Sequence, residues 1–228
     1  MSNHFARHDL YVWNVSSCVS NHAQHAAGLG RAIRSYGMKS LVYCSMGESS
    51  TSEGYFYEAV NGCSLGKLPV IFVIQDNGYG ISVPKRQQTA NHYASDNFAS
   101  FPNLKVIHCD GKDVLDSVRA LREAADFAQS GAGTVLVHAE CVRIGSHSNS
   151  DRHELYRSPE ELAARTARLE KKLGAPVAAN EVYITVDSYR NRLRIWKGDT
   201  LLRDALCSTG SGVRLKDPRN GKEWIFDT

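Results

Sequence analysis

Residues 68–80 read LPVIFVIQDNGYG, an apolar and largely β-branched run that ends in a polar turn. A strand with one face in water alternates apolar and polar residues, but Leu68 to Ile74 is apolar throughout. Such a run is typical of a strand buried on both faces of a parallel sheet. The stretch therefore predicts a central strand whose carboxyl end leads directly into the polar residues 75–82.

Helix and strand patterns alternate on both sides of this stretch, from residue 20 to residue 142. Further strands are predicted at Ser40–Ser45, Leu104–Cys109 and Thr134–Val142, and helices at His22–Tyr36, at about Ser52–Gly66 and after Asp113. This alternation indicates an α/β fold with a parallel sheet and helices on both faces. Such sheets bind ligands beyond the carboxyl ends of their strands, here residues 46–52, 76–84 and 143–157.

The helix starts and buried helix faces can also be predicted. Ser50 with Glu53 three residues later fits a capping box, and Asp113 is a suitable cap for the last helix. The buried faces are expected to carry Phe56, Val60 and Cys63 on the second helix and Leu115, Val118, Leu121, Ala125 and Ala128 on the third.

The composition excludes several classes of protein. With 228 residues, 27 Lys+Arg and 24 Asp+Glu, the net charge of +3 is too small to indicate nucleic acid or an anionic membrane as partner. The longest apolar run is far shorter than the roughly 20 residues of a membrane helix, and no apolar signal-peptide core follows Met1. We therefore expect a cytoplasmic globular protein.

Cysteine and histidine positions support simple structural roles. Six cysteines without a CxxC pair, of which Cys44 and Cys63 lie in apolar patterns, are expected to be reduced and buried. His22 and His25 are close on one helix, but no third metal ligand accompanies them, which favours a surface or pocket-lining role. His108 and His138 lie in strand patterns and are expected to be hydrogen-bonded core residues.

Two of the loops place oxygen-bearing side chains directly after predicted strands. Glu48 lies in GESSTSEG (47–54) and Asn77 in DNGYGIS (76–82), 29 positions later. Each loop alone is explained as well by an ordinary turn, although a helix start can also bind a diphosphate. If the two strands are neighbours, a carboxylate and an amide oxygen converge beside that helix start, an arrangement that suits Mg²⁺.

Several segments resemble one family. The acidic-Gly loop followed by Asn at this interval resembles the thiamine diphosphate motif. The segments GESSTSEGYFYEAVNG, KLPVIFVIQDNGYGISVP, HCDGKDV and VRIGSHSNSD resemble the alpha subunit of 2-oxo acid dehydrogenases, the thiamine-dependent decarboxylating component. The resemblance spans about residues 3 to 170, and residues 143–151 are more similar to branched-chain than to pyruvate enzymes.

The resemblance implies a cofactor site for thiamine diphosphate and Mg²⁺. Glu48, Asn77 and the backbone carbonyl of Tyr79 would hold the metal. The residues implied to contact the cofactor are Gly47, Ser49 and Ser50 at the diphosphate, Ser17 and Val19 at the aminopyrimidine, and Arg143.

The resemblance also implies a catalytic loop. His147 matches the active-site histidine, whose near-neutral titration suits proton transfer. Asp151, Tyr156 and Arg157 match residues that order this loop. Ser148 matches a position that mammalian relatives phosphorylate, although an ordinary loop serine is the favoured reading here.

The chain departs from the family pattern in three ways. Asp76 stands where the family usually has a second asparagine, which adds a negative charge near the metal. A Tyr-Arg pair that grips the diphosphate upstream has no counterpart, so Met1 is expected to be an internal start. The glutamate that activates the aminopyrimidine belongs to a beta-type subunit, so this chain is expected to encode half of a shared site.

The last part of the sequence has a different pattern. We expect a thiamine diphosphate-binding domain at residues 1–176 and a β-rich tail at 177–228, whose alternating segments punctuated by Gly predict hairpins. The tail resembles the opening strands of an L,D-transpeptidase domain but does not reach its nucleophilic cysteine, and no histidine follows Cys207. An incomplete or joined gene product is favoured over a functional second domain.

Together these observations predict the alpha-subunit part of a 2-oxo acid dehydrogenase. The expected reaction is oxidative decarboxylation of a branched-chain 2-oxo acid with acyl transfer to lipoyl. A beta-type subunit and a lipoyl acyltransferase core are the expected partners, with neither nucleic acid nor membrane. The alternatives are a pyruvate or acetoin enzyme, an inactive remnant and, least favoured, a cell-wall cross-linking tail.

Overall fold

The computed structural model describes residues 6–164, 182–187, 192–206, 214–216 and 223–225. The chain divides into two compact units, residues 2–166 and residues 167–228. The domain boundary expected after residue 176 lies outside the described residues, as does Cys207. Among the described residues, no helix combines the length and the apolar character needed to cross a membrane.

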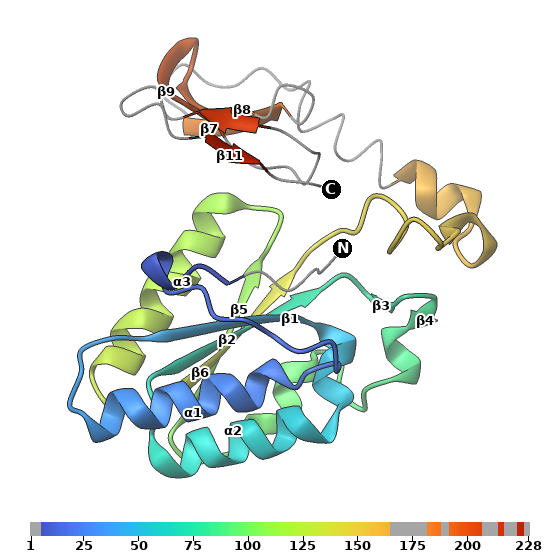
Figure 1. Cartoon of the computed structure of the whole chain (residues 1–228). Helices are drawn as coiled ribbons and strands as arrows, with labels where there is room; N and C mark the ends of the chain where they lie inside the picture. The colour runs from blue at the N-terminus through green and yellow to red at the C-terminus, as the bar shows by residue number, and fades with distance from the viewer. Residues whose placement is uncertain (1–5, 165–181, 188–191, 207–213, 217–222, 226–228) are drawn as a thin grey trace. The chain divides into compact units, whose positions relative to one another are not determined.

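The first unit is built on a four-stranded parallel sheet (Figure 1). Its strands lie in the order β1 (Val42–Gly47), β2 (Val70–Asp76), β6 (Thr134–Glu140) and β5 (Leu104–Asp110). In β2, Val70, Ile71, Phe72 and Ile74 are all fully buried. This confirms the prediction of a parallel sheet with the 68–74 run in its interior.

Helices cover both faces of the sheet, as predicted (Figure 1). The helices α1 (His22–Ser35) and α2 (Gly54–Gly66) pack on one face, and α3 (Val114–Gln129) packs on the other. The predicted inner residues Phe56, Val60 and Cys63 of α2 are fully buried. Each face of the sheet therefore has its own apolar core.

Short elements lie before, between and after the main helices and strands. They are the 3₁₀ helices η1 (His8–Leu10), η2 (Glu48–Ser52), η3 (Lys85–Gln87), η4 (Ala94–Phe98) and η5 (His153–Leu155), and the antiparallel pair β3 (Tyr79–Gly80) and β4 (Val83–Pro84). Residues 159–164 are helical. Most of these elements follow the carboxyl ends of strands, where the candidate site lies.

Two details of the helix predictions are wrong. The capping box of Ser50 and Glu53 does not form, because η2 already occupies this segment and Glu53 is itself the N-cap residue of α2, without a side-chain hydrogen bond. On α3 the predicted inner residues Leu115 and Val118 are exposed. The residues that face the sheet there are Ala120, Ala124 and Ala128, with Leu121 and Ala125 partly buried beside them.

The alanine stripe of α3 has a physical reason. Residues four apart lie on one face of a helix, and alanine side chains allow the helix to lie close to the sheet. The predicted cap of this helix is confirmed: the Asp113 side chain accepts hydrogen bonds from the backbone N–H groups of Leu115 at 2.9 Å and Asp116 at 3.4 Å.

The predicted thiols and histidines are only partly confirmed. Cys44, Cys63 and Cys109 are buried, but Cys18 is exposed and Cys141 is half-buried. His138 is fully buried in β6. His108 is hydrogen-bonded to Asp96 at 2.9 Å, as predicted, but it is not a core residue, because its side chain is 40% exposed on β5, which is an edge strand.

The described strands of the second unit are antiparallel, which confirms the hairpin prediction. The strands β7 (Val182–Asp187), β8 (Arg192–Lys197) and β9 (Thr200–Leu206) form one sheet. The strands β10 (Arg214–Lys216) and β11 (Glu223–Ile225) form a separate pair. Arg194 Nε and Asp204 Oδ2 make a cross-strand ion pair at 3.5 Å.

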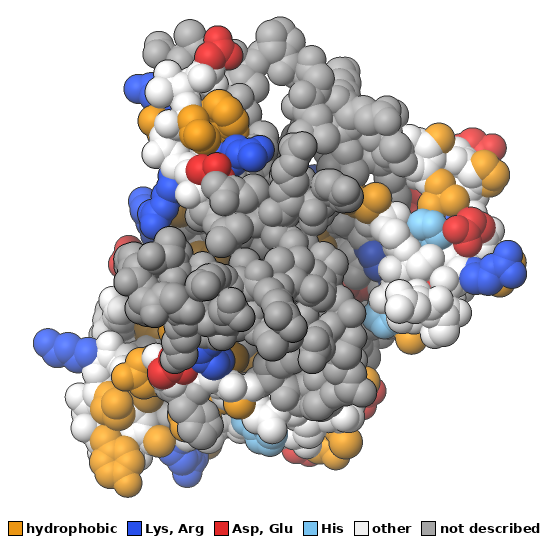
Figure 2. Space-filling model, turned by 45° about the horizontal axis from the view of Figure 1, so that its top comes forward, with side chains coloured by type: hydrophobic (Ala, Val, Ile, Leu, Met, Phe, Trp, Pro, Cys, Tyr) orange, Lys and Arg blue, Asp and Glu red, His pale blue; other side chains and the backbone are white. Residues whose placement is uncertain are grey.

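Charges on the described surface are mixed. On the face seen in Figure 2, Lys and Arg side chains are scattered among Asp and Glu side chains rather than gathered by sign. This arrangement agrees with the nearly balanced composition of the chain.

Candidate functional site

The loops after β1 and β2 meet at the carboxyl edge of the sheet. These strands are adjacent, with Gly47 opposite Gln75 in the register. Glu48 begins η2 directly after β1, and Asn77 follows β2. The backbone N–H and the side-chain amide of Asn77 lie 3.3 and 3.4 Å from Glu48 Oε2. The structure thus brings together two of the three residues predicted to hold a metal.

Both side chains carry an unused oxygen. Glu48 Oε1 and Asn77 Oδ1 are buried and have no hydrogen-bond partner among the described residues. Burial raises the pKa of the Glu48 carboxyl, and the amide hydrogen bonds that it accepts only partly oppose this rise. Buried oxygens without partners are costly, and a hard cation would satisfy a carboxylate and an amide oxygen together. The residues present therefore fit a magnesium ion.

The second loop is folded against the first. Tyr79, the third predicted metal ligand, lies in β3, and Gly80 beside it packs on η2. A Cβ at Gly80 would lie 2.7 Å from the Cβ of Ser49, so any larger residue would force the loops apart. At Gly47 and Gly78, by contrast, a Cβ would meet no atom within 4 Å. Of the predicted diphosphate residues, Gly47 thus lies beside open space and Ser49 beside the second loop, while Ser50 follows Ser49 in η2.

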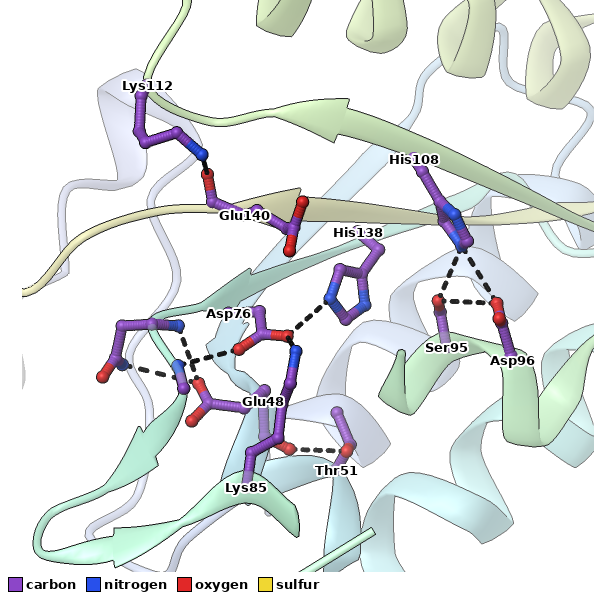
Figure 3. Close-up of polar contacts among 12 residues, drawn as sticks. Glu48, Thr51, Asp76, Lys85, Ser95, Asp96, His108, Lys112, His138 and Glu140 are labelled. Carbon is purple, nitrogen blue, oxygen red and sulfur yellow. Dashed lines mark hydrogen bonds and ion pairs between the residues drawn. The ribbon is translucent and has the colours of Figure 1, made fainter. Parts of the chain in front are cut away.

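Asp76, the last residue of β2, is buried and charged (Figure 3). Its Oδ2 accepts hydrogen bonds from His138 Nε2 at 2.9 Å and from Lys85 Nζ, and its Oδ1 accepts one from the Gly78 N–H at 2.9 Å. Burial raises the pKa of this carboxyl, but the bonds from His138 and Lys85 outweigh burial and lower the pKa to about 2.

Sequence reasoning did not identify Lys85 and His138 as site residues. A signal existed at Asp76, because a carboxylate in place of a neutral amide at a buried strand end requires a compensating donor or cation. Which residues supply that compensation depends on the sheet order, since His138 lies on β6, the strand beside β2.

The 143–157 loop is ordered by a chain of polar contacts. Arg143 Nη2 donates to the Ile81 carbonyl at 2.7 Å and to the Tyr156 hydroxyl at 2.7 Å. That hydroxyl donates to Asp151 Oδ2 at 2.7 Å, which also accepts from the backbone N–H of His147 at 2.6 Å. The hydrogen bond from His147 is the main cause that lowers the pKa of Asp151. Arg143 thus connects this loop to the 77–84 loop.

Arg157 adds a second support to the same loop. Its guanidinium is buried and donates to the Arg143 carbonyl at 3.0 Å. It also lies over the ring of Tyr79, 5.0 Å from the centroid. The His147 side chain itself is exposed, so these contacts fix the backbone of the loop that carries it.

The segment before α1 approaches the end of β1. Ser17 and Val19 are exposed, whereas Ser20 is buried with a positive φ of 64°. The Ser20 hydroxyl lies 3.9 Å from Met46 Sδ, and His22 Nε2 lies 3.1 Å from the Ser45 carbonyl. The segment that carries Ser17 and Val19, predicted to meet the aminopyrimidine, is therefore joined at Ser20 and His22 to the strand that precedes Glu48.

Over the described residues, no group of three His, Cys, Asp or Glu side chains is arranged to hold a metal ion. Amide and carbonyl oxygens can also bind Mg²⁺, and the Glu48–Asn77 pair is therefore the candidate metal position.

The chain is similar to known alpha subunits. It is 30% identical over 184 residues to the 2-oxoisovalerate dehydrogenase subunit alpha of Bacillus subtilis, which covers 81% of this chain and 54% of the relative. It is 37% identical over 149 residues to the pyruvate dehydrogenase E1 component subunit alpha of Mycoplasma pneumoniae, or 65% of this chain and 41% of the relative. For the 3-methyl-2-oxobutanoate dehydrogenase subunit alpha of Mycobacterium tuberculosis, the identity is 32% over 148 residues, or 65% and 40%.

These relatives are longer than the matched region, and the chain spans about half of their length or less. The model of the family described as "Dehydrogenase E1 component" matches residues 2–179, which include the whole parallel sheet and all three loops at its carboxyl edge. The family resemblance seen in the motifs is confirmed, and this chain belongs to the dehydrogenase E1 component family.

Proposed function

We propose that this chain is the alpha-subunit part of a thiamine diphosphate-dependent 2-oxo acid dehydrogenase. The observation that carries the proposal is the pair of buried oxygens without partners, Glu48 Oε1 and Asn77 Oδ1, at the carboxyl edge of a parallel sheet. A site of this kind suits Mg²⁺, which is usually bound through one or two protein oxygens together with phosphate groups.

The residues that would hold the cofactor come from three segments. Glu48, Asn77 and the backbone carbonyl of Tyr79 would bind Mg²⁺, and Gly47, Ser49 and Ser50 would lie along the diphosphate. Ser17 and Val19 would contact the aminopyrimidine, and Arg143 would support the site. When bound, thiamine diphosphate supplies the carbanion stabilisation that decarboxylation of a 2-oxo acid requires.

The protein would orient this chemistry and handle the protons. His147 is exposed on a loop whose backbone is fixed by Asp151, Tyr156 and Arg143. We propose that its imidazole transfers protons at the reacting carbon atoms of the substrate, a role in which histidine is the most common side chain.

The proposed substrate is a branched-chain 2-oxo acid, and the proposed partners are a beta-type subunit and a lipoyl acyltransferase core. The 2-oxoisovalerate enzyme supports this substrate, because its similarity extends over 81% of the chain. The pyruvate enzyme has a higher identity over a shorter match, 37% over 65% of the chain, and pyruvate is therefore the second candidate.

Calorimetric titration of the full chain with thiamine diphosphate and Mg²⁺ tests the site. We expect Mg²⁺-dependent binding that Glu48→Gln weakens at least tenfold, because this change removes a charged ligand. Glu123→Gln is the matched control, since this carboxylate is exposed on α3 and pairs with Lys105. Binding that is unchanged in Glu48→Gln would exclude the proposed metal site.

The same preparation tests the proposed partnership. We expect no decarboxylation of 3-methyl-2-oxobutanoate by the chain alone, because a beta-type subunit would supply the glutamate that activates the aminopyrimidine. Adding such a subunit should produce turnover, with pyruvate as the competing substrate. Turnover by the chain alone would contradict the shared site.

A further inference from the structure

Asp76 lies at the base of the loop that carries Asn77, and its carboxylate is bonded to other groups of the protein. The carboxylate is 2% exposed, and its two oxygens are occupied by His138, Lys85 and the Gly78 N–H. In Figure 3 the side chains of Lys85 and His138 converge on Asp76 from different elements, η3 and β6. Asp76 is therefore fully used in bonds within the protein.

Lys85 closes the loop at two points. Its Nζ pairs with Asp76, and its backbone N–H donates to the Gly78 carbonyl at 2.9 Å. The Gly78 N–H in turn donates to Asp76 Oδ1. Asp76, Gly78 and Lys85 are thus bonded to one another in a closed ring of contacts, the base of the loop. Residues 79–84 extend from this closed base, and Asn77 lies within it.

The charges of this base are balanced. His138 Nε2 donates to Asp76, and its buried Nδ1 has no partner among the described residues. The bond to a carboxylate requires a proton on Nε2 of the ring. Lys85 supplies a positive charge that compensates Asp76.

The balance matters because Glu48 is close. Asn77, the residue after Asp76, contacts Glu48 Oε2 through its backbone N–H at 3.3 Å and its side-chain amide at 3.4 Å. Without Lys85, the buried carboxylate of Asp76 would lose its ion pair beside the place where a negatively charged diphosphate is proposed to bind. Like charges in a buried site repel strongly, and an unpaired buried charge is costly.

We propose that Lys85, with support from His138, is a positioning residue that neutralises Asp76 and holds residues 77–84 so that Asn77 faces Glu48. The consequence for the ligand rests on the proposed function. The consequence for the loop does not, because the ion pair is present in the protein itself.

Hydrogen exchange of the ligand-free full chain tests the effect on the loop. In Lys85→Met the backbone amides of Asn77, Gly78 and residue 85 should exchange at least tenfold faster, because the closed base opens. The control is Lys105→Met, which removes a lysine that pairs with Glu123 at 2.8 Å on the surface. Unchanged exchange in Lys85→Met would overturn the proposal.

The double variant Asp76→Asn/Lys85→Met separates charge from bulk. An amide at position 76 can still accept from the Gly78 N–H, and it leaves no buried charge. We expect this variant to recover most of the protection that Lys85→Met loses. Exchange as fast as in the single variant would contradict the neutralising role. If Lys85→Met does not fold, two other variants test the role. Lys85→Arg keeps the charge and should retain the protection of these amides, and Asp76→Asn/Lys85→Met should fold.

Titration with thiamine diphosphate and Mg²⁺ gives the second readout. Lys85→Met should weaken binding at least tenfold, and the double variant should recover most of it. If the native chain binds neither compound but the exchange results are as expected, the proposed function fails and the positioning role stands. If the native chain binds and Lys85→Met binds equally well, the positioning role fails and the proposed function stands.

Discussion

The two halves of β2 are buried by opposite means. Val70, Ile71, Phe72 and Ile74 are apolar and fully buried, and burial of apolar area has no directional requirement. Two residues later Asp76 is buried as a charge, with partners from the following loop, from η3 and from β6. The apolar half therefore depends on volume, whereas the polar end depends on particular partners in three segments.

The largest expected effect is in the apolar half. Phe72 is fully buried and meets Phe56 edge to face, with ring centroids 5.4 Å apart. Phe72→Ala should lower the free energy of unfolding by about 3–5 kcal/mol, because a large cavity remains. Urea unfolding of the full chain measures this loss.

A matched change shows whether volume is the controlling quantity. Phe72→Leu keeps an apolar side chain of similar size, so its loss should be no more than about 1.5 kcal/mol. Equal losses for Phe72→Ala and Phe72→Leu would contradict the volume argument for this half of β2.

These differences explain how much the sequence could predict. The apolar run of β2 and the cap at Asp113 are local patterns, and the structure confirms both. The convergence of Glu48 and Asn77 needed only one assumption, that two strands are neighbours. The partners of Asp76 were missed because Lys85 and His138 lie 9 and 62 positions away in the chain, and no local periodicity encodes such pairs.

The errors have the same origin. The residues Ser50 and Glu53 match the capping-box pattern, but η2 occupies Glu48–Ser52, so the box does not form. On α3 the larger apolar residues Leu115 and Val118 suggested the buried face, whereas alanines face the sheet. In both cases tertiary packing selected one of several faces or starts that the local sequence allowed.

A second effect in the apolar part of the molecule depends on pH. Burial raises the pKa of Cys44 and of Cys63 from 9.0 to about 12. Above pH 9 the unfolded chain therefore loses these protons while the folded chain keeps them. The contribution of the two thiols to stability is complete below pH 9 and is lost as the pH rises from 9 toward 12.

This prediction can be measured by urea unfolding at pH 8 and pH 10. At pH 10, one unit above the ordinary pKa of a thiol, ionisation of each thiol in the unfolded chain should lower the free energy of unfolding by about 1.4 kcal/mol. The variant Cys44→Ala/Cys63→Ala should show a correspondingly smaller loss between the two pH values. A pH dependence equal to that of the native chain would contradict the prediction.

The smallest expected effect concerns the polar end, where two histidines form a natural comparison. His138 and His108 are opposite each other on β6 and β5, and each ring lies 2.9 Å from an aspartate oxygen. The pair of His138 and Asp76 is 0% and 2% exposed, whereas that of His108 and Asp96 is 40% and 38% exposed.

Phenylalanine in place of either histidine keeps a ring and removes the bond. His138→Phe should lower the free energy of unfolding by about 1.5–3 kcal/mol, because a buried hydrogen bond to a charged group is lost. His108→Phe should cost no more than about 1 kcal/mol, because water replaces the lost partner and screens the charge. Urea unfolding of both variants at pH 8 measures the difference. Equal losses would mean that burial does not set the strength of these two bonds. The dependence of the polar end of β2 on its buried partners would then be contradicted at His138.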